Sequence, residues 1–441
     1  MTRLSPSSRR TFFYDTARFA SAAWTLLAVS PRLHAAIRDS GQRLADRPDD
    51  EIARDEEYWS LVAQAFHLDG RYVILNGGGQ NPPTRDSLDA LVRYEQFATA
   101  QARPNNSALL DRIESHRNRL AQHLNCKSAE VAITRNTTEG LNIVAHGLDL
   151  RDGDEVIVSS FDAAYAGEAF QNRVRRGGIK IVQVDLPEPP RDDDVVERFR
   201  AAISSRTRLI AVSHIADSYG FVLPIRRLAE LAHLHGALML ADGALSFGRI
   251  EVNVQELGCD FYASSLHKWL GAPLGTGVLY VREKLIPSLW PLYGVGEPNV
   301  PDIRKYEWIG TRSGSTIAAI GQAIDFHETI GPSRKAARLN YLLQYVLPRL
   351  DGVPGVTWLS DVEPDRRTIS RIGVRGWSGV QLAAALRERF NFWTLGAPGW
   401  DNTYISPNLF NLTPQMDRFV DAIKTLSRER PPDLDNREKT P

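Results

Sequence analysis

The sequence has few cysteines, no excess of charge of either sign and no long hydrophobic run. Its 441 residues include two cysteines, Cys126 and Cys259, too few for a disulfide framework or a multi-cysteine metal site. The 53 basic and 53 acidic side chains balance, so nothing indicates a nucleic-acid face or a polybasic membrane patch. No apolar run is long enough for a transmembrane helix, and no His or carboxylate spacing indicates a metal site. We therefore expect no nucleic acid partner, no stable membrane span and no metal.

What the chain does contain is an alternation of short apolar runs with helical periodicity. The runs rich in Val and Ile predict strands, and the segments with a 3.6-residue period between them predict helices. Such alternation indicates an α/β fold, with a mostly parallel sheet covered by helices on both faces and ligands at the strand ends. The predicted strands are 129–136, 154–160, 179–186, 208–214, 237–243, 260–265 and 275–281.

The composition along the chain predicts one large and one smaller domain. We expect an N-terminal helical segment at 39–75, including one helix over 49–68, and a large domain at 76–325. A smaller α+β domain is expected at 326–427, together with the N-terminal segment. The tail, 428–441, has little to bury and is predicted to be disordered.

Residues 1–38 resemble a bacterial twin-arginine export signal. The pattern Ser8-Arg9-Arg10-Thr11-Phe12-Phe13 precedes an apolar stretch over 19–29 and the small residues Ala35 and Ala36. The alternative is an amphipathic arm helix that packs on the domain. We expect a periplasmic protein if the segment is an export signal and a cytoplasmic one otherwise.

One lysine lies in an unusual setting. Lys268 stands in "FYASSLHKWLGAPLGTGVLYV", between an apolar run and a Gly/Pro-rich turn. A lysine held against apolar walls loses proton affinity and becomes the nucleophilic amine that Schiff-base chemistry requires. The alternative is a strand-end lysine whose ammonium reaches solvent.

Three other groups at predicted strand ends complete a pattern. Thr137 and Thr138 begin a helix, where they suit a phosphate or serve as a cap. Asp242 ends an apolar strand and needs a cationic partner, such as a protonated pyridine nitrogen or a salt bridge. Ser265 and His267 precede Lys268 and can donate hydrogen bonds to phosphate. A phosphate cradle, a pyridinium partner and an amine are the parts that a protein provides for pyridoxal 5'-phosphate.

The chain resembles the class V aminotransferase family of fold-type I pyridoxal-phosphate enzymes, most closely its isopenicillin-N-epimerase-like branch. The motifs "TRNTTEGLNIVA", "HGALMLADGA", "GCDFYASSLHKWLGAPLGTGVLYV" and "GTRSGST" carry this resemblance.

The resemblance implies roles for individual residues. Lys268 would form the Schiff base, Asp242 would hold the pyridine nitrogen, and Thr138, Ser265 and His267 would bind phosphate with Thr137 nearby. Thr311 would reach the phosphate of a neighbouring subunit, which implies a homodimer. Asn76 would lie near the substrate. His214, at the end of a predicted strand, either faces the cofactor or is a core histidine.

The sequence also departs from the family pattern. Leu245 replaces a Gln at the cofactor's phenolic oxygen, and Asp217 aligns with an Asn that contacts the same oxygen in desulfurase-like relatives. Ala163 falls near the position of the ring-stacking residue, unless Phe161 or Tyr165 takes that role. Tyr404 of "YISPNLFNL" replaces the Arg that clamps the substrate carboxylate. Either another cation, such as Arg312 or Arg371, binds that carboxylate, or the substrate is not a free α-amino acid.

The expected function is pyridoxal-phosphate chemistry on an amino acid or another amine, as a transaminase, epimerase or lyase. An exported member would modify a periplasmic or secreted metabolite, such as a siderophore peptide. The alternative is a degenerate binding or scaffold protein with this fold. Cysteine desulfuration is not expected, because no cysteine follows Cys259 to provide a thiolate near the C-terminal domain.

Overall fold

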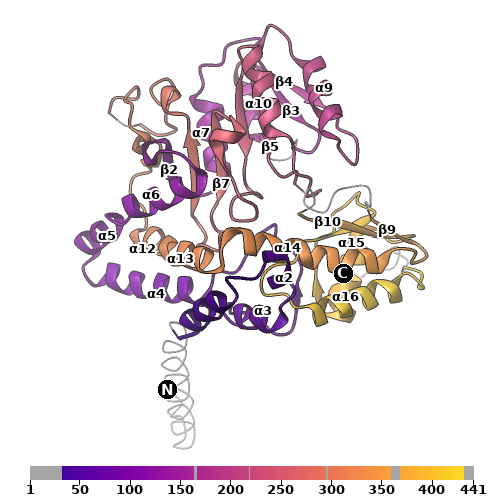
Figure 1. Ribbon diagram of the computed structural model, residues 1–441. Helices are drawn as coiled ribbons and strands as arrows, with labels where there is room; N and C mark the ends of the chain where they lie inside the picture. Colours follow the sequence, from indigo (N-terminus) through magenta and orange to yellow (C-terminus); the bar gives the residue numbers. More distant parts are fainter. Residues whose placement is uncertain (1–31, 163–165, 218, 295, 359–367, 432–441) are drawn as a thin grey trace, which may run out of the picture.

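The computed structural model describes residues 32–162, 166–217, 219–294, 296–358 and 368–431. Its centre is a seven-stranded sheet in the order β2-β8-β7-β6-β5-β3-β4 (Figure 1). Five strands, from β4 to β7, are parallel, and β8 runs antiparallel between β7 and β2. The predicted α/β fold with a mostly parallel sheet is confirmed. The strands are β2 Val131–Thr134, β3 Glu155–Ser159, β4 Lys180–Val184, β5 Thr207–Ser213, β6 Leu238–Asp242, β7 Phe261–Ser265 and β8 Gly277–Val281.

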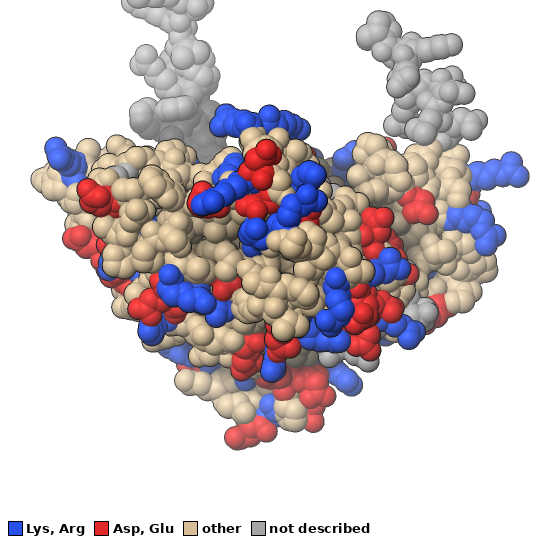
Figure 2. All heavy atoms as spheres, turned by 90° about the horizontal axis from the view of Figure 1, so that it is seen from above, with Lys and Arg blue, Asp and Glu red and all other residues tan. Residues whose placement is uncertain are grey.

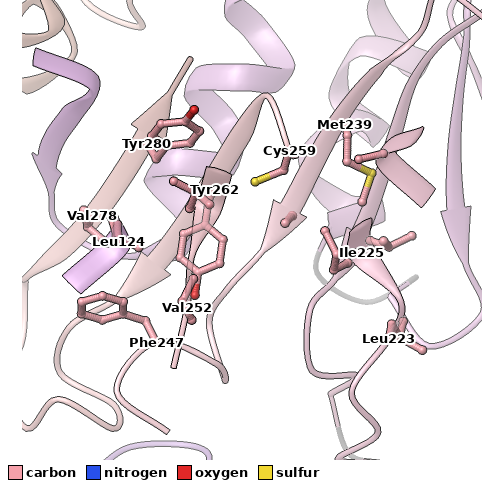
Figure 3. Close-up of a cluster of buried hydrophobic side chains, with 14 of the residues drawn as sticks. Leu124, Leu223, Ile225, Met239, Phe247, Val252, Cys259, Tyr262, Val278 and Tyr280 are labelled. Atoms are coloured by element: carbon pink, nitrogen blue, oxygen red, sulfur yellow. The ribbon is translucent and has the colours of Figure 1, made fainter. Parts of the chain in front are cut away.

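Helices cover both faces of this sheet. Side chains along a strand point alternately to the two faces, and here they are apolar on each face. Helices α7 (Thr137–Gly147) and α8 (Ala166–Gly177) pack on one face, where Val156, Leu209 and Leu240 meet Leu141 and Phe170. Helices α6 (Ile113–Leu124), α9 (Asp192–Ala202) and α10 (Ile225–Leu234) pack on the other. Figure 3 shows part of this second layer, in which Met239, Tyr262 and Tyr280 of three strands gather with Cys259 and Phe247.

A second, three-stranded antiparallel sheet lies in the C-terminal part of the chain. It consists of β9 (Val356–Trp358), β10 (Ser370–Val374) and β12 (Asn402–Ile405). Helices α14 (Pro332–Val346), α15 (Gly379–Phe390) and α16 (Thr413–Leu426) cover it (Figure 1). The N-terminal segment joins this part, since β1 (Val73–Ile74) pairs with β11 (Phe392–Trp393). The predicted boundary at residues 325/326 falls inside α13 (Ile320–Ile330), and the division into domains stays a prediction.

The described residues also form helices between these elements. They are α2 Asp49–Ile52, α3 Glu56–Ala63, α4 Arg85–Ala100, α5 Ala102–Leu110, α11 Val254–Leu257 and α12 Gly314–Ala318. The single helix predicted over 49–68 is wrong. Asp55 interrupts it, because its carboxylate accepts a hydrogen bond from the Tyr58 amide and caps a new helix, α3.

The N-terminal arm packs against the body of the protein. Residues 32–43 are helical, and Ile37, 1% exposed, lies in a cluster with Trp59, Phe66 and Phe326. The imidazole of His34 hydrogen-bonds Asp86 (3.0 Å) and Thr329 (2.9 Å). This packing is the one expected of an arm helix. The paired arginines of the predicted export signal lie outside the described residues.

The surface of the described residues carries charges of both signs. Basic and acidic side chains are interspersed on the face seen in Figure 2. Across the described ranges, no helix is both long and apolar enough to span a bilayer.

Candidate functional site

A cavity of about 710 Å³ lies at the carboxyl ends of the central strands. The last residues of three neighbouring strands line it: Ser213 of β5, Asp242 of β6 and Ser265 of β7. Parallel strands place their carboxyl ends at one edge of a sheet, which is where ligands bind in such folds. The first turn of α7 forms a second wall, and residues 395–404 of the C-terminal part form a third.

Lys268 lines this cavity, in the turn that follows β7. Burial of its side chain lowers the pKa of the ammonium, while the charges of Asp242 and Asp217 act in the opposite direction. Its main chain is held on both sides. The Lys268 amide donates to the Ser265 carbonyl (3.3 Å), and its carbonyl accepts from Asn81 Nδ2 (3.0 Å). The lysine is therefore presented to the cavity on an anchored turn.

Asp242 is almost fully buried in the same cavity, at 4% exposure. Burial raises the pKa of its carboxyl group to about 7, although the Ala244 amide donates to Oδ1 (2.9 Å) and Lys268 is a nearby cation. The charges of Asp162 and Asp217 raise it further. Such a carboxylate is stabilised in its charged form by a cationic partner brought into the cavity.

Hydroxyl and amide donors gather at the start of α7. The Thr137 amide and hydroxyl both contact Ser265 Oγ, at 2.9 and 2.8 Å, and Thr138 lies beside them in the wall. The helix is capped by Asn136, whose side chain accepts from the Glu139 amide (2.9 Å). The two threonines are thus not needed as caps, and the helix start favours an anion.

His267 completes this end of the cavity. Its Nδ1 is buried and has no hydrogen-bond partner among the described residues. Burial lowers the pKa of the imidazole. A buried ring nitrogen without a partner is a place where a ligand atom would be accommodated.

The opposite end of the cavity is apolar. Leu245 and Tyr404, two of the positions that depart from the family pattern, pack in one cluster with Ile215 and Ile369. Tyr404 lies so close to the loop after β1 that a Cβ atom on Gly78 would collide with its hydroxyl. The replacements at 245 and 404 are therefore parts of one wall, which Leu395, Ala397 and Trp400 extend. Asn76 provides a polar group beside it, whereas Asp217 acts electrostatically on Asp242 and Lys268.

His214 does not belong to this cavity. Adjacent residues of a strand point to opposite faces, so Ser213 and Ile215 line the cavity while His214 points away. It lines a separate hollow of about 430 Å³ together with Phe247 and His327. Burial lowers the pKa of His214 to about 4. Of the two predicted roles of His214, facing the cofactor or being a core histidine, the structure favours the second.

The other predicted cations are also elsewhere. Arg312 donates to the Ile133 carbonyl (3.0 Å) and lies 3.7 Å from Glu307, outside the cavity lining, and Thr311 is exposed on the turn before it. Arg371 is the cross-strand neighbour of Tyr404. Its guanidinium stacks between the rings of Tyr219 (4.0 Å) and Trp400 (4.4 Å), so it lies behind the wall that Trp400 forms.

Two of the three candidates for ring stacking, Ala163 and Tyr165, lie outside the described residues. The third, Phe161, packs against Tyr219 (4.3 Å between ring centroids) and Phe221 (5.9 Å) in the core and does not line the cavity. Neither cysteine lines it, and burial raises the pKa of both thiols to about 12. In the part of the chain that the structure describes, no group of ligands fits a metal ion.

Sequence reasoning missed several lining residues. They come from four regions: the loop after β1, the strand ends, the α7–α8 side and the C-terminal wall. Ser213 had a signal, because it stands next to the last residue of the predicted strand 208–214. The C-terminal residues had none, since only the tertiary fold brings them beside Lys268. The missed residues are Gly79, Asn136, Leu141, Asn142, Glu168, Ala169, Asn172, Ser213, Ile215, Ala244, Leu395, Ala397 and Trp400.

Comparison with known proteins gives consistent results. Isopenicillin N epimerase of Streptomyces clavuligerus is 29% identical over 398 residues, which cover 84% of this chain and 99% of that protein. The epimerase of Amycolatopsis lactamdurans is 29% identical over 394 residues, with the same coverage. The structure of a cysteine desulfurase from Thermococcus onnurineus has the same fold, with a TM-score of 0.74 and 21% identity over 83% of this chain and 97% of that one. The family profile "Aminotransferase class-V" matches residues 88–393. The chain therefore belongs to the class V aminotransferase family, whose members are pyridoxal-phosphate-dependent enzymes.

Proposed function

We propose that this enzyme acts on an amine or amino acid, with Lys268 as the amine that carries the cofactor. One observation carries the proposal: Lys268 and Asp242 line one cavity with the donor-rich start of α7. The relatives at 29% identity support chemistry at the carbon beside an amine, because they are named as epimerases.

The residues of the cavity fit pyridoxal phosphate. Asp242, buried and with a raised carboxyl pKa, suits a protonated pyridine nitrogen. The phosphate would be held by Thr137, Thr138, Ser265 and His267, where donors and a helix start converge. Lys268 Nζ would hold the aldehyde carbon. The volume of about 710 Å³ lies within the range of cofactor and small-ligand sites.

The bound cofactor supplies an electron sink for the carbanion that forms when the substrate carbon beside the amine loses a proton. Lys268 Nζ, released when the substrate amine replaces it at the aldehyde carbon, would take that proton, and burial lowers the pKa of its ammonium. Asp242 keeps the pyridine nitrogen charged. The wall of Leu245, Trp400 and Tyr404 keeps water from the reacting carbon. Transamination, epimerisation and elimination share this proton transfer, and the proposal covers that shared step.

A covalent map of the cofactor tests this function. Purified protein is incubated with pyridoxal phosphate, reduced with borohydride, digested and analysed by mass spectrometry. We expect the cofactor mass on the peptide that contains Lys268 and none in the Lys268→Ala variant. Lys335 is a natural comparison, since it too is buried, with a pKa lowered to about 7. An adduct on Lys335, or no uptake of cofactor, would contradict the proposal.

We propose a homodimer in which Thr311 reaches the partner's phosphate site. Thr311 is exposed before α12 and does not line the cavity of its own chain, as this role requires. Light scattering of the purified protein should give twice the mass of the chain. Thr311→Ala should weaken binding of the cofactor without changing that mass. A monomer that binds the cofactor fully would contradict the arrangement.

Export by the twin-arginine route is a further proposal, and it rests on the sequence pattern of residues 8–13 with the apolar stretch that follows. The packing of His34 and Ile37 on the body of the protein weighs against cleavage near Ala35. Replacing Arg9 and Arg10 by lysine should retain an exported protein in the cytoplasm. An unchanged distribution would reject export and leave the arm-helix reading.

A further inference from the structure

A second hollow adjoins the main cavity. It has a volume of about 340 Å³ and is lined by Tyr72, Ile74 and Trp393, together with the polar residues Asp69, Asn76 and Gln80. Asn76 lines both this hollow and the main cavity. Its Oδ1 is buried and has no hydrogen-bond partner in the described parts of the chain. The two spaces therefore meet at the Asn76 side-chain oxygen, which accepts no hydrogen bond from the described residues.

The two hollows share one floor. Strand β1 pairs in parallel with β11, and the Val73 and Leu75 amides donate to the carbonyls of Asn391 and Trp393, both at 2.8 Å. Side chains alternate between the faces of such a ribbon. Val73, Leu75 and Phe392 point into the core of the C-terminal part.

The opposite face of the ribbon is the floor. It carries Tyr72, Ile74 and Asn76 on one strand and Trp393 and Leu395 on the other. Leu395 and Asn76 belong to the main cavity, and the rest belong to the second hollow. Trp393, in the second hollow, is 44% exposed, and Leu395, in the main cavity, is 40% exposed. A contiguous exposed apolar surface beside a cavity is typical of a binding surface.

The indole of Trp393 is held in place. Tyr72 packs against it edge to face, with 5.9 Å between ring centroids, and Arg387 Cζ lies 5.5 Å from its centroid. An aromatic ring ordered before binding loses little entropy when a ligand packs on it.

We propose that this floor, Tyr72, Ile74, Asn76, Trp393 and Leu395, binds the distal part of an elongated amine substrate. The inference rests on the proposed function, which places the reacting amine at Lys268. The distal part is apolar or aromatic, since four of the five floor side chains are apolar or aromatic. Two strand residues span about 7 Å, so it lies roughly 7 to 13 Å beyond Asn76. A short amino acid reaches only the first cavity.

Matched amines test the proposal. Hexylamine and 6-phenylhexylamine share the same reacting end and chain, and they differ by a phenyl ring. Dissociation constants are measured on the cofactor-loaded protein by the shift of cofactor absorbance and, independently, by quenching of tryptophan fluorescence. We expect 6-phenylhexylamine to bind roughly tenfold more tightly than hexylamine, because its ring is buried on the floor. Fluorescence quenching should accompany binding of the longer amine.

Substitutions locate the effect. Trp393→Ala should reduce the tenfold ratio to about twofold, and Trp393→Phe should restore part of it. Leu234→Ala, at an exposed apolar position at the end of α10, serves as the control and should leave the ratio unchanged. If protein with normal cofactor uptake keeps the full ratio in Trp393→Ala, the floor is not a substrate site, and the proposed function stands.

Two further results would overturn the proposal in other ways. A protein that takes up no cofactor at Lys268 refutes the proposed function and, with it, the floor. If Trp393→Ala instead changes the mass of the protein in solution and leaves the ratio intact, the floor is a contact between two copies of the chain.

Discussion

The two ends of the cavity are built in different ways. At the cofactor end, Asp242, Ser265 and the α7 threonines stand where consecutive strands and helices of one sheet meet. At the substrate end, Leu245 and Ile215 meet Tyr404 and Ile369, which belong to the C-terminal part. The first end is set by the backbone of a rigid sheet. The second depends on how two parts of the chain pack, so it can change without disturbing the first.

The two ends also differ in charge. Asp242, Asp217 and Lys268 lie together at the cofactor end, and the described C-terminal wall residues, Leu395, Ala397, Trp400 and Tyr404, are uncharged. Burying an unpaired charge is costly. The cofactor end is therefore the place where a single substitution should have the largest effect.

Removal of the carboxylate at the cofactor end is the most severe change. Asp242→Asn should weaken pyridoxal phosphate binding by roughly 300-fold, because breaking a buried ion pair costs about 3 to 5 kcal/mol. Cofactor affinity is measured by titration of the visible absorbance. An affinity within about threefold of the wild type would show that Asp242 does not hold the ring.

The same carboxylate should make the cofactor-free protein sensitive to pH. Its pKa is raised to about 7 in the folded state, above its ordinary value, so folding takes up a proton between the two values. Stability from this group is complete below pH 4 and falls as pH rises towards 7, by up to about 1.4 kcal/mol per pH unit.

The pH effect is isolated by difference. The free energy of unfolding of the wild type minus that of Asp242→Asn, measured by urea unfolding at pH 5, 6, 7 and 8, should decrease with pH. His214 and His327 titrate equally in both proteins and cancel. A flat difference would mean that Asp242 is ionised throughout.

At the substrate end, a substitution at Gly78 should displace the Tyr404 side chain in the apolar wall. A Cβ atom there would meet the Tyr404 hydroxyl, so Gly78→Ala should destabilise the protein by about 1 to 3 kcal/mol. Gly70→Ala is the control, because no atom lies within 4 Å of a Cβ built there. Thermal unfolding of both variants checks the prediction. Equal melting temperatures would show that Tyr404 moves aside without cost.

The smallest expected effect comes from placing a charge in the apolar wall, and it concerns the relative affinity for two amines. Tyr404→Arg introduces a guanidinium group that can donate two parallel hydrogen bonds to a carboxylate. The affinity for alanine relative to ethylamine should therefore rise by about tenfold. The ratio is measured by spectral titration of the cofactor-loaded protein. Tyr404→Gln, which introduces a linear polar side chain without a charge, should give no such rise. A rise in both variants would assign the effect to space and not to charge.

The same contrast explains what the sequence could and could not predict. The strands and the residues at their ends follow from local patterns, so the sheet and the grouping of Lys268 with Asp242, Ser265 and Thr137 were within reach. The role of His214 stayed open because a strand end has two faces, and the sequence does not say which one meets the cavity. Leu395, Ala397 and Trp400 were missed because their nearness to Lys268 is purely tertiary.

Two further misses have local causes. The helix over 49–68 is divided by Asp55, whose capping hydrogen bond competes with helix continuation. Arg312 follows a predicted polar turn, but its guanidinium is used by the Ile133 carbonyl on a neighbouring strand. In both cases a hydrogen bond to a specific partner determines the local structure, and the local sequence pattern does not reveal that bond.

The pairing at the mouth of the cavity has a consequence for synthesis of the protein. The Ser406 amide donates to the Leu75 carbonyl (2.7 Å), and the Ser406 carbonyl accepts from Gly77 (2.8 Å). These bonds connect a segment made early by the ribosome with one made near the end. The central sheet is complete once residue 281 has emerged, but Asn76 and Tyr404 cannot be brought together until Ser406 follows. All named residues of the cofactor end are thus synthesised before the Tyr404 segment that completes the wall at the substrate end.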